Sequence, residues 1–328
     1  MNNTFHDKDL HDKNFLVTGA AGFIGSHIAE YLLKNGAKKV RVLDNMVNGF
    51  QSNLDLLKPY PAFEFIEGDI RNLETCQQVC SNIDYVTHQA ALGSVPRSIK
   101  DPQTTNDVNV GGFVNILKAS VDNNVKRFVY ASSSSVYGDE PTLPKQEGRI
   151  GNCLSPYAVS KRVDEMYAQV FADVYKIPVI GLRYFNIFGP RQDPDGPYAA
   201  VIPLFVKGII NKTPVYINGD GEQTRDFTFV ENAVQVNIKA MLSDNEEALN
   251  KIYNVAVGEN FSVNAVYDSV KKYLQMEHTP TYRESRASDV RNSLADISLA
   301  KNLLDYRPTT KFEDGLKETI KYFKNLNS

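Results

Sequence analysis

The sequence predicts an α/β protein: a Rossmann-type, doubly wound parallel sheet with a smaller C-terminal α/β lobe. Short runs rich in β-branched and aromatic residues alternate with longer segments of helical periodicity through the first half of the chain. Strands that alternate with helices form parallel sheets covered by helices on both faces. The strands are expected at 15–18, 40–43, 63–66, 85–88, 128–131 and 179–182, and the intervening helices at 23–35, 108–121 and 157–175.

The alternation stops near Phe188, where Gly189-Pro190 and Asp193-Pro194-Asp195-Gly196-Pro197 have the composition of loops. Beyond them we expect helices at 201–210, 231–242 and 263–274, and a short strand at 215–217. Residues 1–185 should form the sheet domain and 186–328 mainly the second lobe, with some exchange of chain between the two. Ligands of open α/β sheets bind at the carboxyl ends of the strands, so this lobe should cover that edge and bind the substrate.

Composition and charge exclude several classes of protein. The formal net charge is -3 and there is no basic run, so a nucleic-acid partner is not expected. The N-terminus lacks the apolar core of a signal peptide and no apolar run could cross a bilayer, so we expect a cytoplasmic protein without a membrane partner. The three cysteines do not make a disulfide framework, and Cys76 and Cys80 lack the further ligands of a metal site, so no metal is expected.

A glycine-rich turn lies between the first expected strand and its helix. It reads Gly19-Ala20-Ala21-Gly22-Phe23-Ile24-Gly25, with the spacing G-x-x-G-x-x-G. Glycines at this turn let the backbone approach a pyrophosphate, whose charge lies on the helix N-terminus. Three glycines alone could be an ordinary tight turn, but a strand before them and a helix after them favour dinucleotide binding.

Asp44 ends the second expected strand, 19 residues after Gly25. A carboxylate there accepts hydrogen bonds from ribose hydroxyls and repels a 2′-phosphate, which favours NAD over NADP and makes residues 1–185 the NAD-binding domain. The alternative is a turn-forming Asp-Asn pair with Asn45. Further cofactor contacts are expected after the third strand, at Asp69 and Ile70, and after the fourth, at Gln89, Ala90 and Ala91.

A catalytic constellation is indicated by Tyr157 and Lys161, which are one helical turn apart and share a helix face. The pKa of an ordinary tyrosine is about 10, and the positive charges of a lysine and an oxidised nicotinamide would lower it. Chance matches to Tyr-x-x-x-Lys are common. Here Ser132 to Ser135 are expected just past the fifth strand, at the edge where a hydroxyl could bond the substrate oxygen as its proton leaves.

With these motifs the chain resembles the extended short-chain dehydrogenase/reductase family and, within it, the bacterial UDP-N-acetylglucosamine 4-epimerases. The resemblance runs from Phe15 to about Tyr322. It rests on five motifs: Thr18 to Gly25, Ser133 to Gly138, Tyr157 to Lys161, Leu182-Arg183-Tyr184-Phe185-Asn186, and Asp220-Gly221-Glu222-Gln223-Thr224-Arg225-Asp226-Phe227.

The resemblance implies roles for individual residues. Ser133 matches the catalytic Ser or Thr, Tyr157 the base and Lys161 its partner. The substrate-binding set that it implies includes Ser133 and Tyr157. Its other members are Asn186, Arg225 and Arg286 at the sugar diphosphate, Asp289 at the uridine ribose, Ala200, Val201, Tyr216 and Asn218 around the uracil, and Gly93, Ser94, Ser134, Ser135 and Ser293 near the sugar. The expected cofactor set is completed by Asn45, Asn48, Gly49, Asn109, Tyr157, Lys161 and Tyr184. Relatives pair through two long helices, here 108–121 and 157–175, so a homodimer is expected.

Two positions depart from the galactose epimerases of this family. Their active-site lysine after the fourth strand is replaced by Gly93, followed by Ser94. Their bulky tyrosine, four residues after the ribose aspartate, is replaced by Ser293. Both changes leave more room or a different polarity around the sugar.

The function implied is NAD-dependent C4 epimerisation of UDP-N-acetylglucosamine and UDP-N-acetylgalactosamine through a 4-keto intermediate. The closest alternative is a UDP-hexuronic acid 4-epimerase, or one that acts on UDP-glucose and UDP-galactose. A 4,6-dehydratase is disfavoured, because Ser134 and Ser135 stand where that family carries an Asp-Glu pair. A silent NAD-binding scaffold is disfavoured by the intact Ser133, Tyr157 and Lys161.

Overall fold

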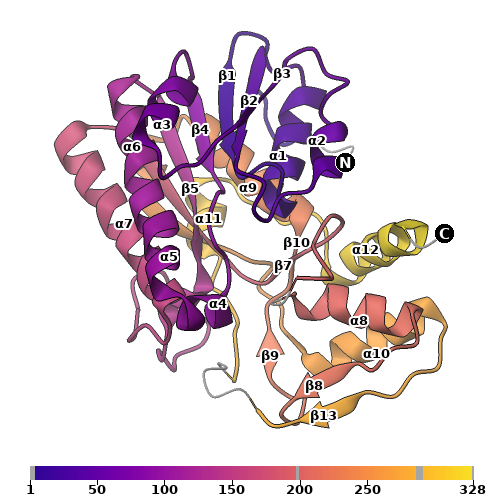
Figure 1. The fold of residues 1–328 in the computed structure, drawn as a ribbon. Helices are drawn as coiled ribbons and strands as arrows, with labels where there is room; N and C mark the ends of the chain where they lie inside the picture. The colour runs from indigo at the N-terminus through magenta and orange to yellow at the C-terminus, as the bar shows by residue number, and fades with distance from the viewer. Residues whose placement is uncertain (1–3, 197–198, 286–290, 327–328) are drawn as a thin grey trace.

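The chain is built around one seven-stranded parallel sheet (Figure 1). The structure, a computed structural model, describes residues 4–196, 199–285 and 291–326. The strand order β11-β6-β5-β4-β1-β2-β3 is that of a doubly wound sheet, which confirms the predicted fold class. The strands are β1 Asn14–Thr18, β2 Lys39–Asp44, β3 Phe63–Glu67, β4 Tyr85–His88, β5 Arg127–Ser133, β6 Val179–Tyr184 and β11 Lys251–Val255.

Helices cover both faces of the sheet because successive strand residues point to opposite sides. In β1, Phe15 and Val17 pack into the core under α1 (Phe23–Lys34), α9 (Val230–Leu242) and α11 (Ser298–Leu303). Leu16, between them, packs into the core under α3 (Leu73–Cys80), α6 (Gly112–Asp122) and α7 (Pro156–Tyr175). Figure 1 shows the second group of helices as one layer on the left of the sheet.

The smaller lobe has its own apolar core, which includes Phe205, Tyr267 and Phe312. Three helices supply most of it, and three short strand pairs, β7 with β10, β8 with β13 and β9 with β12, complete the lobe. The elements are α8 Val201–Ile210, α10 Val263–Leu274, α12 Phe312–Leu326, β7 Ile187–Phe188, β8 Tyr216–Asn218, β9 Thr224–Arg225, β10 Thr228–Phe229, β12 Phe261–Ser262 and β13 Thr281–Arg283.

Two elements from the second half of the chain return to the sheet. The strand β11 pairs in parallel with β6, from Lys251 beside Ile180 to Val255 beside Tyr184. The helix α9 lies against α1, β4 and β5, and almost all of its residues are buried. The strand β11 was not predicted from the sequence, because a run of five residues without alternation carries little local signal.

The segments before α7 differ in detail from expectation. The helix expected at 108–121 begins earlier, with α5 (Pro102–Asn106), and passes through a π-helical turn, Asp107–Gly111, into α6. The serines expected just past the fifth strand begin inside it, because β5 extends to Ser133 and Ser134 opens a 3-10 helix that ends at Tyr137. The remaining elements are α2 Gln51–Asp55, α4 Val95–Lys100 and the 3-10 helix Glu246–Ala248. Among the described helices, none is both long and apolar enough to cross a membrane.

Candidate active site

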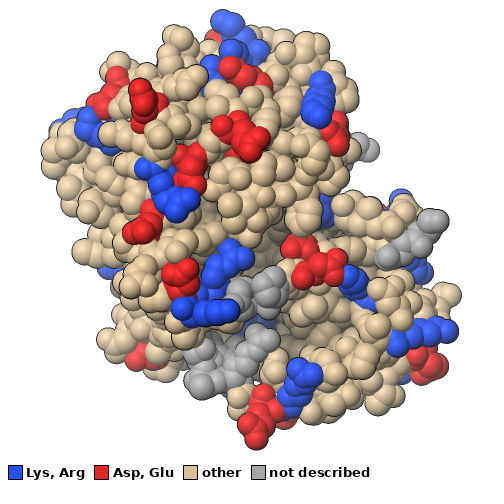
Figure 2. Space-filling view, viewed as in Figure 1, with Lys and Arg blue, Asp and Glu red and all other residues tan. Residues whose placement is uncertain are grey.

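A cleft of about 670 Å³ lies at the carboxyl edge of the sheet, where the smaller lobe faces the sheet domain. It corresponds to the hollow between the upper and lower parts of the molecule in Figure 2. Most of the expected cofactor-binding residues line it: Gly19, Gly22, Phe23, Ile24, Gly25, Asp44, Asn45, Asn48, Gly49, Ile70, Gln89, Ala90, Ala91, Tyr157, Lys161 and Tyr184. Asp69 and Asn109 do not line it but contact residues that do.

The glycine turn has the geometry of a pyrophosphate site. Gly19 has φ +72°, and a Cβ on it would lie 2.7 Å from the backbone nitrogen of Ala90. A Cβ on Gly25 would lie 2.5 Å from the carbonyl oxygen of Gly19. The helix α1 begins directly after Gly22, and no side chain caps its first N–H groups. These donors are therefore free to bind an anion brought close by the glycines.

The carboxylate of Asp44 lies at the end of β2, inside the cleft. Its two oxygens accept hydrogen bonds from the backbone N–H groups of Ala21 and Met46, each at 2.9 Å. Burial raises the pKa of Asp44, although these hydrogen bonds oppose the shift. Asp69 follows β3 and accepts a hydrogen bond of 2.9 Å from the amide of Asn45. The glycines and this carboxylate therefore fit an NAD whose adenosine ribose faces Asp44.

One side of the cleft is held by a buried hydrogen-bond network that includes a residue not predicted from the sequence. The hydroxyl of Tyr184 donates to Gln89 Oε1 at 3.0 Å and accepts from Asn237 Nδ2 at 2.7 Å. Thr87 donates to Asn237 Oδ1 at 3.0 Å. Burial raises the pKa of Tyr184 far above that of a free tyrosine, so its phenol stays protonated. Asn237 lies within α9, where no local motif marks it.

The three expected catalytic residues, Ser133, Tyr157 and Lys161, line the same cleft. Ser133 is the last residue of β5, and its Oγ accepts a hydrogen bond of 3.2 Å from the backbone N–H of Ser135. Tyr157 is the second residue of α7, whose start is fixed by Pro156 in the first turn and by Ser155 as N-cap. The helix then carries Lys161 into the cleft one turn further on.

Lys161 has a buried partner that the sequence analysis missed. Its ammonium donates to Oδ2 of Asp164 at 3.2 Å, and the two side chains are 3% and 0% exposed. Burial raises the pKa of Asp164 to about 7, against the opposing effect of Lys161. The spacing of three residues on a helix was the available signal, because it places both side chains on one face. Next to Lys161, Ser160 accepts a hydrogen bond of 3.1 Å from Asn109.

A second cavity of about 240 Å³ meets the cleft at Asn186, which lines both. Besides Asn186, four of the expected substrate-binding residues line it: Ser134, Ser135, Arg225 and Ser293. Lys145, which was not predicted, also lines it, whereas no acidic side chain among the described residues does. The buried Oγ of Ser135 has no hydrogen-bond partner within the described part of the chain. The cavity therefore offers hydroxyl groups and positive charge to a ligand.

The remaining residues expected to bind the substrate do not all line the two cavities. Gly93, Ser94 and Ala200 line the cofactor cleft, and Val201 follows as the first residue of α8. Tyr216 and Asn218 lie on β8 and line neither cavity, and the guanidinium of Arg283 lies 3.1 Å from the centre of the Tyr216 ring. Arg286 and Asp289 lie outside the described residues.

A parallel sheet with a glycine turn, a carboxylate at the end of β2 and a Ser-Tyr-Lys set in one cleft defines the class of the protein: a nicotinamide-dependent short-chain dehydrogenase/reductase. Residues 15–256 match the model of the NAD dependent epimerase/dehydratase family. The chain belongs to this family, and NAD is its cofactor. The resemblance inferred from the motifs is thereby confirmed.

The proteins that are similar to this chain are named for different sugars. A structure of the UDP-N-acetylglucosamine 4-epimerase from Methanobrevibacter ruminantium, in complex with UDP-N-acetylmuramic acid, aligns with a TM-score of 0.91 and 38% identity, over 96% of this chain and 99% of that one. The UDP-glucuronate 4-epimerase of Thermodesulfobacterium geofontis is 32% identical over 94% of this chain and 96% of its own length. The UDP-glucose 4-epimerase of Mycolicibacterium smegmatis is 32% identical over 94% and 98%.

Proposed function

We propose that this protein interconverts UDP-N-acetylglucosamine and UDP-N-acetylgalactosamine by inverting C4 through a 4-keto intermediate. The observation that carries the proposal is the presence of Ser133, Tyr157 and Lys161 in the cleft that also contains the glycine turn and Asp44. The three similar proteins reported above are named as UDP-sugar 4-epimerases, which supports the substrate class.

In this mechanism Tyr157 is the base that takes the proton from the sugar 4-hydroxyl. The positive charge of Lys161 favours the phenolate, and the hydroxyl of Ser133 bonds the sugar oxygen as its proton leaves. The glycine turn and Asp44 would hold NAD, which would supply the hydride acceptor for a reaction without net oxidation. Arg225 holds the diphosphate while the keto sugar turns its other face, because a guanidinium binds phosphate through paired hydrogen bonds.

The second cavity supports the proposed preference for an acetamido sugar. Ser293, Ser134 and Ser135 are among the residues that line this space of about 240 Å³. A tyrosine in place of Ser293 would fill part of that space. The cavity therefore has both the room for an acetamido group at C2 and the donors to bond it.

One observation favours the alternative, a UDP-hexuronic acid 4-epimerase. Lys145 is 4% exposed, lines the second cavity with Arg225, and donates from its ammonium to the carbonyl of Glu140. A carboxylate on the sugar could be balanced by this charge. We rank this function second, because the ammonium of Lys145 already donates a hydrogen bond to a backbone carbonyl. By contrast, the hydroxyl of Ser135 has no hydrogen-bond partner among the described residues.

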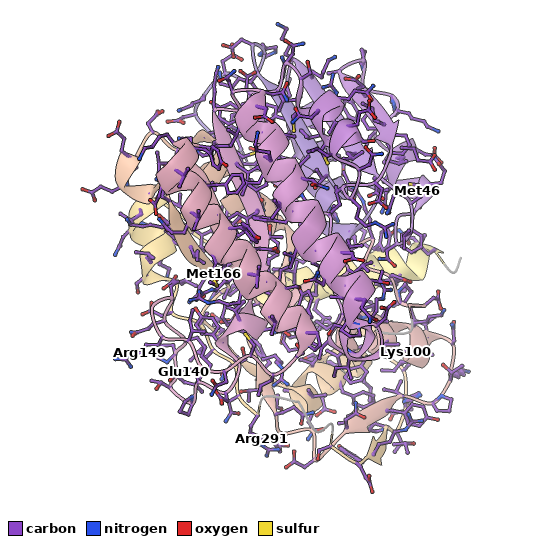
Figure 3. All side chains as sticks on the ribbon, turned by 60° about the vertical axis from the view of Figure 1, so that its left-hand side comes forward. Met46, Lys100, Glu140, Arg149, Met166 and Arg291 are labelled. Atoms are coloured by element: carbon purple, nitrogen blue, oxygen red, sulfur yellow. The ribbon has the colours of Figure 1, made fainter. Side chains whose placement is uncertain are left out.

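We also propose a cytoplasmic homodimer without nucleic-acid or membrane partners. An apolar strip on α7 supports the dimer, with Val159, Met166, Val170 and Val174 each 49–64% exposed. In Figure 3 α6 and α7 run side by side on the face turned forward, with Met166 labelled on α7. The free cysteines fit a reducing compartment. On the face in Figure 2 basic and acidic side chains are interspersed, unlike the basic surface that binds nucleic acid.

The test is NMR analysis of product mixtures from UDP-N-acetylglucosamine, UDP-glucose and UDP-glucuronic acid, each incubated with the purified protein. The C4 epimer of the acetylated sugar should form fastest. Preferential conversion of the glucuronic acid would establish the alternative, and conversion of none of the three would refute both proposals.

A further inference from the structure

We propose that Asp164 is a positioning residue for catalysis: it holds the ammonium of Lys161, offsets part of its charge, and so sets the pH at which Tyr157 becomes a base. The inference rests on the proposed roles of Tyr157 and Lys161. The ammonium–carboxylate distance is 3.2 Å, and both side chains are almost completely buried. Asp164 is the only hydrogen-bond partner of this ammonium among the described residues. In this buried position an adjacent charge acts without much screening by water.

The second oxygen of Asp164, Oδ1, is buried and has no hydrogen-bond partner within the described part of the chain. The carboxylate is therefore not held by a structural network of its own. Its neighbour Glu165, by contrast, accepts hydrogen bonds from Ser132, Arg162 and Arg183. An isolated buried carboxylate is costly unless it serves the charge beside it.

Few other charges act on this pair. Lys161 and Glu165 are the charged groups that affect the ionisation of Asp164. From β5, the phenol of Tyr130 faces the two carboxylates, and burial raises its pKa so far that it stays neutral. From β4, His88 lies near Lys161, and burial, aided by Lys161, lowers its pKa to about 3, so it is neutral too. Several other elements also pack on α7: α4, α5, α6, β6, the π-helical turn, and the 3-10 helix that follows β5. Their described residues add no charge that acts on Asp164.

The sign of the effect follows from this arrangement. Burial raises the pKa of Asp164 to about 7, so the carboxyl ionises across neutral pH. When it is ionised, it cancels part of the Lys161 charge that would stabilise the phenolate of Tyr157, so the base forms less readily. When it is protonated, the full charge of Lys161 acts on the phenol. Asp164 therefore restrains the base as the pH increases.

The experiment removes this charge while it keeps the shape. Asp164→Asn leaves an amide oxygen for the Lys161 ammonium. The ionisation of Tyr157 is measured on NAD-loaded protein as the ultraviolet difference absorbance between each protein and its Tyr157→Phe counterpart. We expect the midpoint to fall by about one pH unit, the lower end of the range for an adjacent charge. The acid limb of the pH profile of kcat/KM, measured with the sugar that the protein converts, should shift by the same amount. Asp173→Asn, which neutralises an exposed carboxylate on the same helix, should move neither.

An unchanged midpoint in folded Asp164→Asn would overturn the inference and leave Asp164 with a structural role only. If that variant does not fold, the smaller Asp164→Ser tests the same charge, with the same expected shift and the same refuting result. The absorbance titration requires no turnover. Absence of turnover in the unchanged protein would therefore refute the proposed function, whereas absence of the shift would refute this inference alone.

Discussion

Arg183, near the end of β6, binds the carboxylate of Glu165 on α7 through two hydrogen bonds of 2.8 and 2.9 Å. Ser132 on β5 donates to the same carboxylate at 2.7 Å. This buried contact ties two adjacent strands to the helix that carries Tyr157 and Lys161. It therefore fixes the distance between Ser133, which follows Ser132, and the proposed base. A buried bidentate pair of this kind is costly to break, because either partner alone would be an uncompensated charge.

Removal of the phenolic oxygen tests the base. In Tyr157→Phe the ring remains but no group can take the proton from the 4-hydroxyl, so kcat should fall by roughly 10²–10⁴-fold or more. Circular dichroism and thermal unfolding should be nearly unchanged. Tyr167→Phe, a change of the same size on an exposed part of α7, is the control and should leave kcat intact. A Tyr157→Phe protein with a near-normal rate would exclude Tyr157 from the mechanism.

The sugar preference is tested at Ser293. Ser293→Tyr should abolish turnover of the acetylated sugars, because the ring would occupy the cavity shared with Ser134 and Ser135, and should leave UDP-galactose turnover largely intact. The measurement is kcat/KM for each pair of epimers. Ser285→Tyr, at an exposed serine in the same lobe, is the control. Equal losses for both types of sugar would refute the role of Ser293 in selectivity but not the epimerase function.

The choice of cofactor depends on Asp44. Mass spectrometry of the supernatant from denatured, freshly purified protein should detect NAD(H) and not NADP(H), because the carboxylate would repel a 2′-phosphate. Asp44→Asn should weaken NAD retention by about tenfold or more, as expected for the loss of a hydrogen bond to a charged group. NADP(H) alone in the unchanged protein would show that Asp44 does not contact the ribose.

Acid stability depends on Glu30, which pairs with Arg191 and Lys34. Burial raises the pKa of Glu30, but the charges and hydrogen bonds of Arg191 and Lys34 outweigh it and lower the pKa to about 2. A depressed pKa contributes stability that is present above the unfolded value of about 4.3 and is lost as the pH falls towards 2. The contribution at neutral pH is at most about 3 kcal/mol.

Chemical denaturation at several pH values measures this contribution. Glu30→Gln should lower the free energy of unfolding near neutral pH and flatten its fall in acid, whereas Glu74→Gln, at an exposed position on α3, should do neither. Because Arg191 also lines the cofactor cleft, the Glu30→Gln protein should retain less NAD. An unchanged acid profile would show that the ion pair adds nothing to stability.

The proposed dimer is tested on the apolar strip of α7. Val170, in the middle of the strip, is 53% exposed. Val170→Glu would bury a charge in the interface, so light scattering should change from the mass of two chains to that of one. Leu56→Glu, at a site of similar exposure outside α7, should not change the mass. A monomeric unchanged protein would contradict the proposal.

Sequence patterns predicted the parts of this molecule that depend on local chemistry. The turn from Gly19 to Gly25, Asp44 at a strand end and the pair Tyr157 and Lys161 each carry their signal within a few residues, and the structure places all of them in one cleft. Their roles stay predictions. By contrast, the strand β11, Asn237 beside Tyr184 and the contact of Arg183 with Glu165 depend on segments that meet only in the folded chain. No local sequence pattern predicts such long-range contacts.

In the proposed mechanism C4 is inverted by a hydride that leaves and returns within the same site. The most direct measurement is the mass and NMR spectrum of product formed from UDP-N-acetylglucosamine in heavy water. Hydride held on the cofactor does not exchange with solvent, so the UDP-N-acetylgalactosamine formed should carry no deuterium on carbon. One deuterium at C4 would show that the hydrogen leaves as a proton and would contradict the account.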